Sequence, residues 1–138
     1  MRLVPEGAAS APRPPGRMPD LTYPLILNTG RVRDHWHTMT RTGKSPRLSG
    51  HIAEPFVAMH SQDAATSGLA DGTLASVLSD WGEAIVRVRI SADQPAGQVF
   101  IPMHWNDQFA PTARVGALIN PFTDPVSGQP EFKHTPVR

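Results

Sequence analysis

The chain has 138 residues, no cysteine and a formal net charge of +1 at pH 7, which suits one domain of common size. The lack of cysteine excludes disulfides, thiolate metal sites and cysteine-ligated iron–sulfur clusters within this chain. The near-neutral charge favours neither nucleic acid nor an acidic membrane as a partner, and no apolar run approaches the length of a membrane-spanning helix.

Residues 1–20 differ in composition from the rest of the chain. They contain five prolines and few large aliphatic side chains. Such a stretch buries too little apolar surface to offset its ordering entropy. The sequence therefore predicts a disordered linker or a remnant of expression over residues 1–20, and one folded domain over residues 21–138.

Short strands separated by turns dominate the rest of the chain. The clearest signal is Glu83–Ile90, where Val86, Val88 and Ile90 alternate with two arginines and predict a half-buried strand. A short helix is expected at Gln62–Ser67, capped by Ser61, while residues 113–119 fit either a helix or a strand. Strands are expected at residues 23–29, 55–60, 73–79, 83–90, 98–102 and 130–137. About six strands with one or two short helices favour a mostly-β barrel, because closure removes exposed edges.

The most unusual stretch is the opening segment, Asn28–Leu48. Between residues 31 and 47 it contains five arginines or lysines, two histidines and one tryptophan, with Asp34 as its one acid. Arginine offers a planar fork of donors that suits phosphate, and a strand ending in Thr-Gly can form a backbone anion nest. The chemistry predicts a binding loop for an anionic, planar ligand. A solvated loop anchored by a buried Trp36 is an open alternative on residue chemistry alone.

The pattern His35-Trp36-His37 raises a second alternative, a metal site. Histidines two apart share one face of a strand and can share an ion, as in the cupin family of β-barrels. The glutamate that the first cupin motif needs is absent after His37, and neighbouring arginines repel a divalent cation. A cupin-like metal-binding barrel is therefore the less favoured interpretation.

Three blocks of sequence resemble a known family. Thr29-Gly30-Arg31 with residues 35–41 resembles the opening motif of the C-terminal domain of molybdopterin oxidoreductases, the bis-molybdopterin guanine dinucleotide enzymes that include nitrate reductases and formate dehydrogenases. Residues 99–105 resemble that domain's penultimate strand, and residues 124–133 its closing motif. The order and spacing agree over residues 21–138, and the form His-Trp-His-Thr-Met-Thr-Arg is most similar to assimilatory nitrate reductases.

The resemblance implies an aspartate-decarboxylase-like double-psi β-barrel that binds molybdopterin guanine dinucleotide. At Gly116 the chain lacks the asparagine with which many members contact the cofactor, and Asn120 follows four residues later. The residues implied in cofactor binding are Thr29, Gly30, Arg31, His35, Trp36, His37, Thr38, Phe132 and Lys133.

The resemblance also implies that this chain is part of a longer catalytic subunit. The parent would be a cytoplasmic oxidoreductase of nitrate assimilation that reduces nitrate to nitrite at molybdenum, with formate dehydrogenase as the alternative. Iron–sulfur clusters and the molybdenum ligand would belong to other domains, which would be the partners of this one. The isolated domain, with neither catalytic nor metal-ligating residues of its own, is expected to be inactive. A β-barrel interaction module without a ligand is a further alternative.

Overall fold

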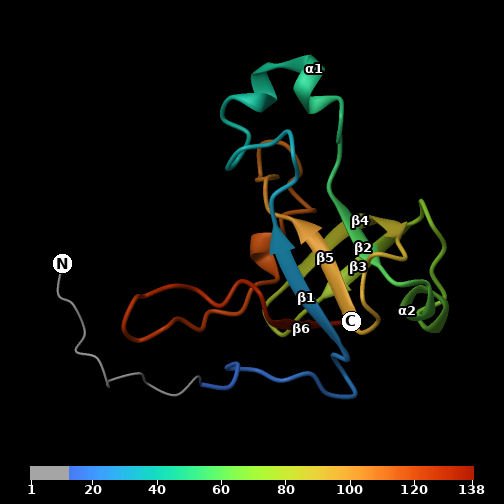
Figure 1. The fold of residues 1–138 in the computed structure, drawn as a ribbon, viewed down its shortest axis with the longest axis vertical. Helices are drawn as coiled ribbons and strands as arrows, with labels where there is room; N and C mark the ends of the chain where they lie inside the picture. Colours follow the sequence, from blue (N-terminus) through green and yellow to red (C-terminus); the bar gives the residue numbers. More distant parts are fainter. Residues whose placement is uncertain (1–12) are drawn as a thin grey trace.

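The computed structural model describes residues 13–138, and six β-strands form its framework (Figure 1). The predicted linker thus lies mostly outside the described residues. In its described part, Arg17 pairs with Asp20 at 2.7 Å and with Asp80 at 2.9 Å, so residues near Arg17 contact the barrel. The strands are β1 (Leu25–Gly30), β2 (Phe56–Met59), β3 (Leu74–Leu78), β4 (Glu83–Ile90), β5 (Gln98–Pro102) and β6 (Thr135–Val137).

The strands pair in the order β3-β4-β2-β5-β1-β6. The pairs β1/β5 and β2/β4 are parallel, and the other pairs are antiparallel. Two backbone hydrogen bonds of 2.9 and 3.0 Å between Leu78 and Arg138 join the two edges. The predicted mostly-β, double-psi β-barrel is therefore confirmed, because the sheet curls until its first and last strands meet (Figure 1).

The core lies inside this barrel and follows the alternation of the strands. In β4, Val86 and Val88 are buried, whereas Arg89 points outward and is exposed, as the sequence predicts. In β3 the buried face is the one with Ala75 and Val77. The fully buried apolar side chains of the barrel include Leu27, Val86, Val88, Val99, Ile101, Leu118 and Val137.

The helices are short, and the structure corrects the cap of α2 and the start of the last strand and settles one open region. The α2 helix is capped by His60 rather than Ser61, because the His60 ring nitrogen Nδ1 accepts the Gln62 N–H at 3.2 Å. Residues 113–119, which fit either a helix or a strand by sequence, contain a 3-10 turn. The last strand begins at Thr135 rather than Pro130, because residues 123–130 make a separate turn closed by one bridge. The helical elements are η1 (Thr42–Lys44), α1 (Pro46–Ser49), α2 (Ser61–Thr66) and η2 (Val115–Ala117).

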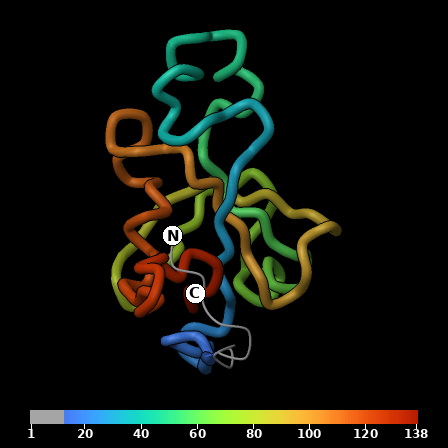
Figure 2. The backbone as a smooth tube through the Cα atoms, turned by 60° about the vertical axis from the view of Figure 1, so that its left-hand side comes forward, coloured from blue at the N-terminus to red at the C-terminus, as the bar shows by residue number. Residues whose placement is uncertain are grey.

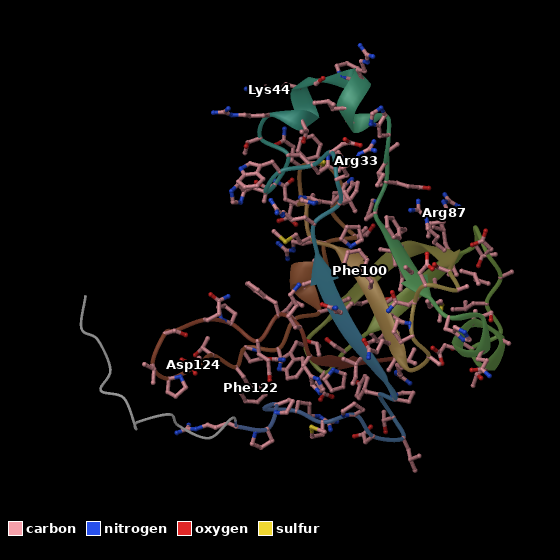
Figure 3. The ribbon with its side chains drawn as sticks, viewed as in Figure 1. Arg33, Lys44, Arg87, Phe100, Phe122 and Asp124 are labelled. Atoms are coloured by element: carbon pink, nitrogen blue, oxygen red, sulfur yellow. The ribbon has the colours of Figure 1, made fainter. Side chains whose placement is uncertain are left out.

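One end of the barrel carries a cap. Figure 2 shows that residues 31–52 and residues 103–112, which are far apart in sequence, both lie above the same end of the strands. Arg33 and Lys44 lie in this cap, while Phe122 and Asp124 lie on a loop that extends to the side of the barrel, below the cap in this view (Figure 3). Among residues 13–138, no helix has the length and apolar character needed to cross a membrane.

Candidate functional site

The candidate site lies where two parallel strands end together. The register of β1 and β5 sets Gly30 beside Pro102. The Met103 N–H then donates to the Gly30 carbonyl at 3.0 Å, which extends the pairing by one step. The opening segment leaves β1 at this point and the block around His104 leaves β5. The fold thus brings together two blocks that are about 70 residues apart in the chain.

Arg31, Trp36 and His37 form an exposed row of planar groups on the cap. The guanidinium carbon of Arg31 lies 4.9 Å from the centroid of the Trp36 ring. The His37 ring meets Trp36 edge-on, with the centroids 4.5 Å apart. Because Trp36 is 52% exposed, the alternative of a loop anchored by a buried Trp36 is wrong, and the buried tryptophan is Trp105. Such a row can stack on a planar ligand and donate hydrogen bonds to an anion.

Thr38 continues this exposed surface. It lines a polar hollow of about 310 Å³ together with Lys44, Asn106 and Gln108. These side chains come from both halves of the cap and offer hydroxyl, ammonium and amide groups to one space. The hollow therefore adds hydrogen-bonding capacity next to the Arg31 row.

The cap retains unneutralised positive charge. Its one acid between residues 28 and 48, Asp34, accepts from Arg33 at 3.1 Å and contacts the His51 ring at 2.8 Å. The hydrogen bond from Arg33, followed by that from His51, holds the pKa of Asp34 below its ordinary value. Across residues 13–138, the ion pairs involve none of the cations Arg31, Arg41, Lys44 and Arg47. These four charges are free to attract an anion.

His35 lies inside the cap rather than on its surface. It is 4% exposed, and its two ring nitrogens lie 3.2 Å from the Thr42 hydroxyl and 3.1 Å from the Ile52 carbonyl. His35 therefore ties the opening segment together from within, whereas His37 faces outward. This arrangement does not favour the metal alternative, which needs both rings on one face.

His104 bridges the two blocks. The ring is fully buried; its Nε2 accepts the Val32 N–H at 2.9 Å, and its Nδ1 lies 2.7 Å from the His37 carbonyl. Because a carbonyl only accepts, Nδ1 carries the proton and Nε2 does not. Burial is the main cause of a lowered pKa for His104, partly opposed by the bond to His37. No role for this histidine follows from local sequence patterns, although a buried polar residue between the buried Pro102 and Trp105 is a usable signal.

The closing block reaches the same place from the other side. The Lys133 ammonium donates to the Thr29 carbonyl, although 104 positions separate the two residues. A Cβ atom at Gly30 would lie 3.6 Å from this ammonium and 3.3 Å from the Phe100 ring, so glycine leaves the end of β1 open. The Thr29 hydroxyl donates to the Ile101 carbonyl inside the barrel, and Phe132 is 42% exposed. Thr29 thus presents its backbone to the site, and not its side chain.

Asn120 supports the closing block. It is 2% exposed, and its amide nitrogen lies 3.1 Å from a Glu131 carboxylate oxygen and 3.1 Å from the His134 carbonyl. Its side-chain oxygen accepts the Phe122 N–H at 3.0 Å. These bonds fix both ends of the 121–133 loop that carries Lys133. Asn120 therefore supports Lys133 indirectly, by holding this loop in place.

Two buried polar atoms lie where β1 and β6 separate, close in sequence to Thr29 and Lys133. In the described part of the chain, neither Asn28 Oδ1 nor His134 Nε2 has a hydrogen-bond partner. β1 and β6 pair with Leu27 opposite Thr135, and continuing this register by one residue sets Asn28 opposite His134. Buried polar atoms usually find partners.

Comparisons with known proteins agree on one family. A family model described as "Molydopterin dinucleotide binding domain" matches residues 25–136. The chain is 50% identical to the nitrate reductase of Klebsiella oxytoca, covering 99% of this chain and 15% of that protein. It is 37% identical to the assimilatory nitrate reductase catalytic subunit of Bacillus subtilis (92% and 17% covered). It is 38% identical to the F420-dependent formate dehydrogenase 1 subunit alpha of Methanococcus maripaludis (86% and 17% covered).

A solved structure has the same fold. Acetylene hydratase from Pelobacter acetylenicus superposes with a TM-score of 0.73 at 20% identity, covering 84% of this chain and 18% of that one. The chain therefore spans between 15% and 18% of the length of these relatives, which are all much larger proteins.

Proposed function

Because this chain belongs to the molybdopterin dinucleotide-binding domain family, we propose that its capped barrel end holds one face of a bis-molybdopterin guanine dinucleotide cofactor. The observation that carries this proposal is the exposed row of Arg31, Trp36 and His37 beside the Gly30–Lys133 opening. The row offers a cation and two aromatic rings, and the opening offers bare backbone and an ammonium. A dinucleotide presents matching groups, namely a pyrophosphate and planar heterocycles with polar edges.

Each residue of the site has a distinct part in this proposal. Gly30 and Arg31 bind the pyrophosphate, through backbone N–H groups and the guanidinium. Trp36, His37 and Thr38 contact planar or polar edges, while Lys133 and Phe132 contact the cofactor from the closing block. His35 and the Thr29 side chain are buried, and they hold the loop in shape. When bound, the cofactor supplies the molybdenum redox chemistry, and these residues bind and orient it.

We infer that the parent protein is a cytoplasmic nitrate reductase that converts nitrate to nitrite during nitrate assimilation. The 50% identity to a nitrate reductase over nearly the whole chain supports this choice. Formate oxidation is the second candidate, supported by the 38% identity to a formate dehydrogenase subunit. The other domains of the parent would carry the iron–sulfur cluster and complete the cofactor site. The isolated domain would then bind without turnover.

Calorimetric titration with GDP tests the binding proposal, since GDP carries the guanine and pyrophosphate of the cofactor. We expect weak binding to the wild-type chain and a loss of about tenfold or more in Arg31→Ala, because a charge-assisted hydrogen bond contributes about 1.5–3 kcal/mol. Arg47→Ala is the matched control, since it removes the same charge from the exposed face of α1. Equal losses in both variants, or no GDP binding to the wild type, would contradict a defined site at Arg31.

A further inference from the structure

We propose that His104 is a positioning residue that clasps the opening segment in the conformation that presents the Arg31 row. One buried ring holds the Val32 N–H at 2.9 Å through Nε2 and the His37 carbonyl at 2.7 Å through Nδ1. These two partners flank residues 33–36. A single side chain, two residues beyond the end of β5, therefore sets the distance between the two ends of the loop. The ligand in this proposal rests on the proposed function, whereas the clasp itself is a property of the fold.

The backbone of the loop explains why a clasp is needed. His37 has a φ of +47° and Met39 a φ of +60°, and both are non-glycine residues in the left-handed region. This region is sterically unfavourable for side chains with a Cβ, so the conformation requires outside support. The Nδ1–H of His104 binds the carbonyl of His37, the first of these two residues. The clasp therefore acts where the loop is least favourable on its own.

The surroundings of His104 fix its orientation. The His35 ring centroid lies 5.4 Å from that of His104, and the Trp105 centroid lies 6.3 Å away. The charged or titratable groups that face the ring are His35, His37 and the cation Arg31. A second proton, on Nε2, would remove the acceptor for Val32 and place a positive charge near Arg31. The neutral ring with its proton on Nδ1 is therefore the form that closes the clasp.

Two near-isosteric variants separate the two bonds of the clasp. In His104→Gln the side-chain carbonyl reaches the place of Nε2 and can still accept from Val32. In His104→Asn the amide lies at the place of Nδ1, so it can donate to His37 but does not reach Val32. His104→Ala removes both bonds. Amide hydrogen exchange of Val32, measured by NMR on the 138-residue chain, reads the first bond directly, and amides of β4 report whether the barrel is folded.

We expect the Val32 amide to be protected in the wild type and in His104→Gln. In His104→Ala and His104→Asn it should exchange at least about tenfold faster while the β4 amides keep their protection. Nitrogen chemical shifts of His104 should show the proton on Nδ1. Unchanged Val32 exchange in His104→Asn, or a proton on Nε2, would overturn the clasp. Because His104→Asn removes only the hydrogen bond to Val32, its exchange data test the clasp even if His104→Ala does not fold.

GDP titration of the same variants tests the positioning role. We expect affinity to fall about tenfold in His104→Ala and to recover at least in part in His104→Gln. Faster Val32 exchange with unchanged GDP affinity would overturn the positioning role. A wild type that binds no GDP would instead contradict the proposed function, and the exchange data would still decide whether the clasp exists.

Discussion

At the scale of single residues, His35, His37 and His104 of the cap have different environments. A strand-like alternation predicts His35 and His37 on one face, yet His35 is buried and His37 is exposed. The sequence could not reveal this difference, because it depends on the left-handed backbone at His37. His104 illustrates a second limit of prediction from sequence, which concerns distant partners. Its two bonds reach 67 and 72 positions back in the chain, and local sequence patterns contain no information about partners at that separation.

The buried neutral state of His104 predicts a pH dependence of stability. Burial lowers the pKa of His104 in the folded chain below its ordinary value of 6.5. Between 6.5 and that lowered pKa the unfolded chain binds the proton and the folded chain does not. The free energy of unfolding should therefore fall as pH decreases through this window, by up to about 1.4 kcal/mol per pH unit.

His104→Gln cannot titrate, so it should lack this contribution. Urea unfolding of both chains at about pH 7.5 and about pH 5.5 measures the effect above the range of the carboxylates. We expect the stability advantage of the wild type over His104→Gln to shrink at the lower pH. Parallel pH profiles for the two chains would show that His104 does not contribute.

At the scale of elements, alternation of side chains predicted the strands well and the helices less well. β4 and β5 have the predicted bounds: Val86 and Val88 alternate with two arginines in β4, and β5 is a short run of apolar residues after Gln98. The short helices η1 and α1 within the opening segment were not predicted, since three or four residues show no helical period. Pro46 at the first position of α1 is the one local signal that this segment offered.

The hairpin of β3 and β4 packs closely on η2, and Gly82 makes this contact possible. A Cβ atom at Gly82 would clash with the Ala117 carbonyl, which is a backbone group and cannot rotate away. We expect Gly82→Ala to lower the free energy of unfolding by about 1–3 kcal/mol, as for other overpacked sites. Urea unfolding measures this change.

Gly116→Ala is the matched control on the facing element η2. A Cβ atom at Gly116 would meet only the Arg114 side chain, at an ordinary 3.8 Å. We therefore expect a change within about 0.5 kcal/mol. Similar losses in the two variants would mean that the contact between the hairpin and η2 is loose.

At the scale of the whole molecule, the candidate site forms because the barrel brings distant segments to one end. The six expected short strands predicted a small barrel, but they did not predict the strand order β3-β4-β2-β5-β1-β6. Pairing partners depend on the three-dimensional path of the chain, and only the family resemblance implied that path. For the same reason, the resemblance assigned both Thr29 and Lys133 to cofactor binding, but their direct contact was not predicted.

Closure of the barrel depends on a short seam between the end of β3 and the end of the chain after β6, where Leu78 meets Arg138. Val137 is 1% exposed, and the Arg138 backbone makes both hydrogen bonds to Leu78. Deleting residues 137–138 should lower the free energy of unfolding by roughly 3–5 kcal/mol, from about 1.5–3 for the buried valine and about 1 for each hydrogen bond. Arg138→Ala is the control, because it keeps the backbone and removes only a guanidinium 5.7 Å from the Tyr23 ring. We expect it to change stability by less than about 1 kcal/mol. If urea unfolding gave the same stability for the deletion and for Arg138→Ala, the seam would not hold the barrel closed, and β6 would contribute only through β1.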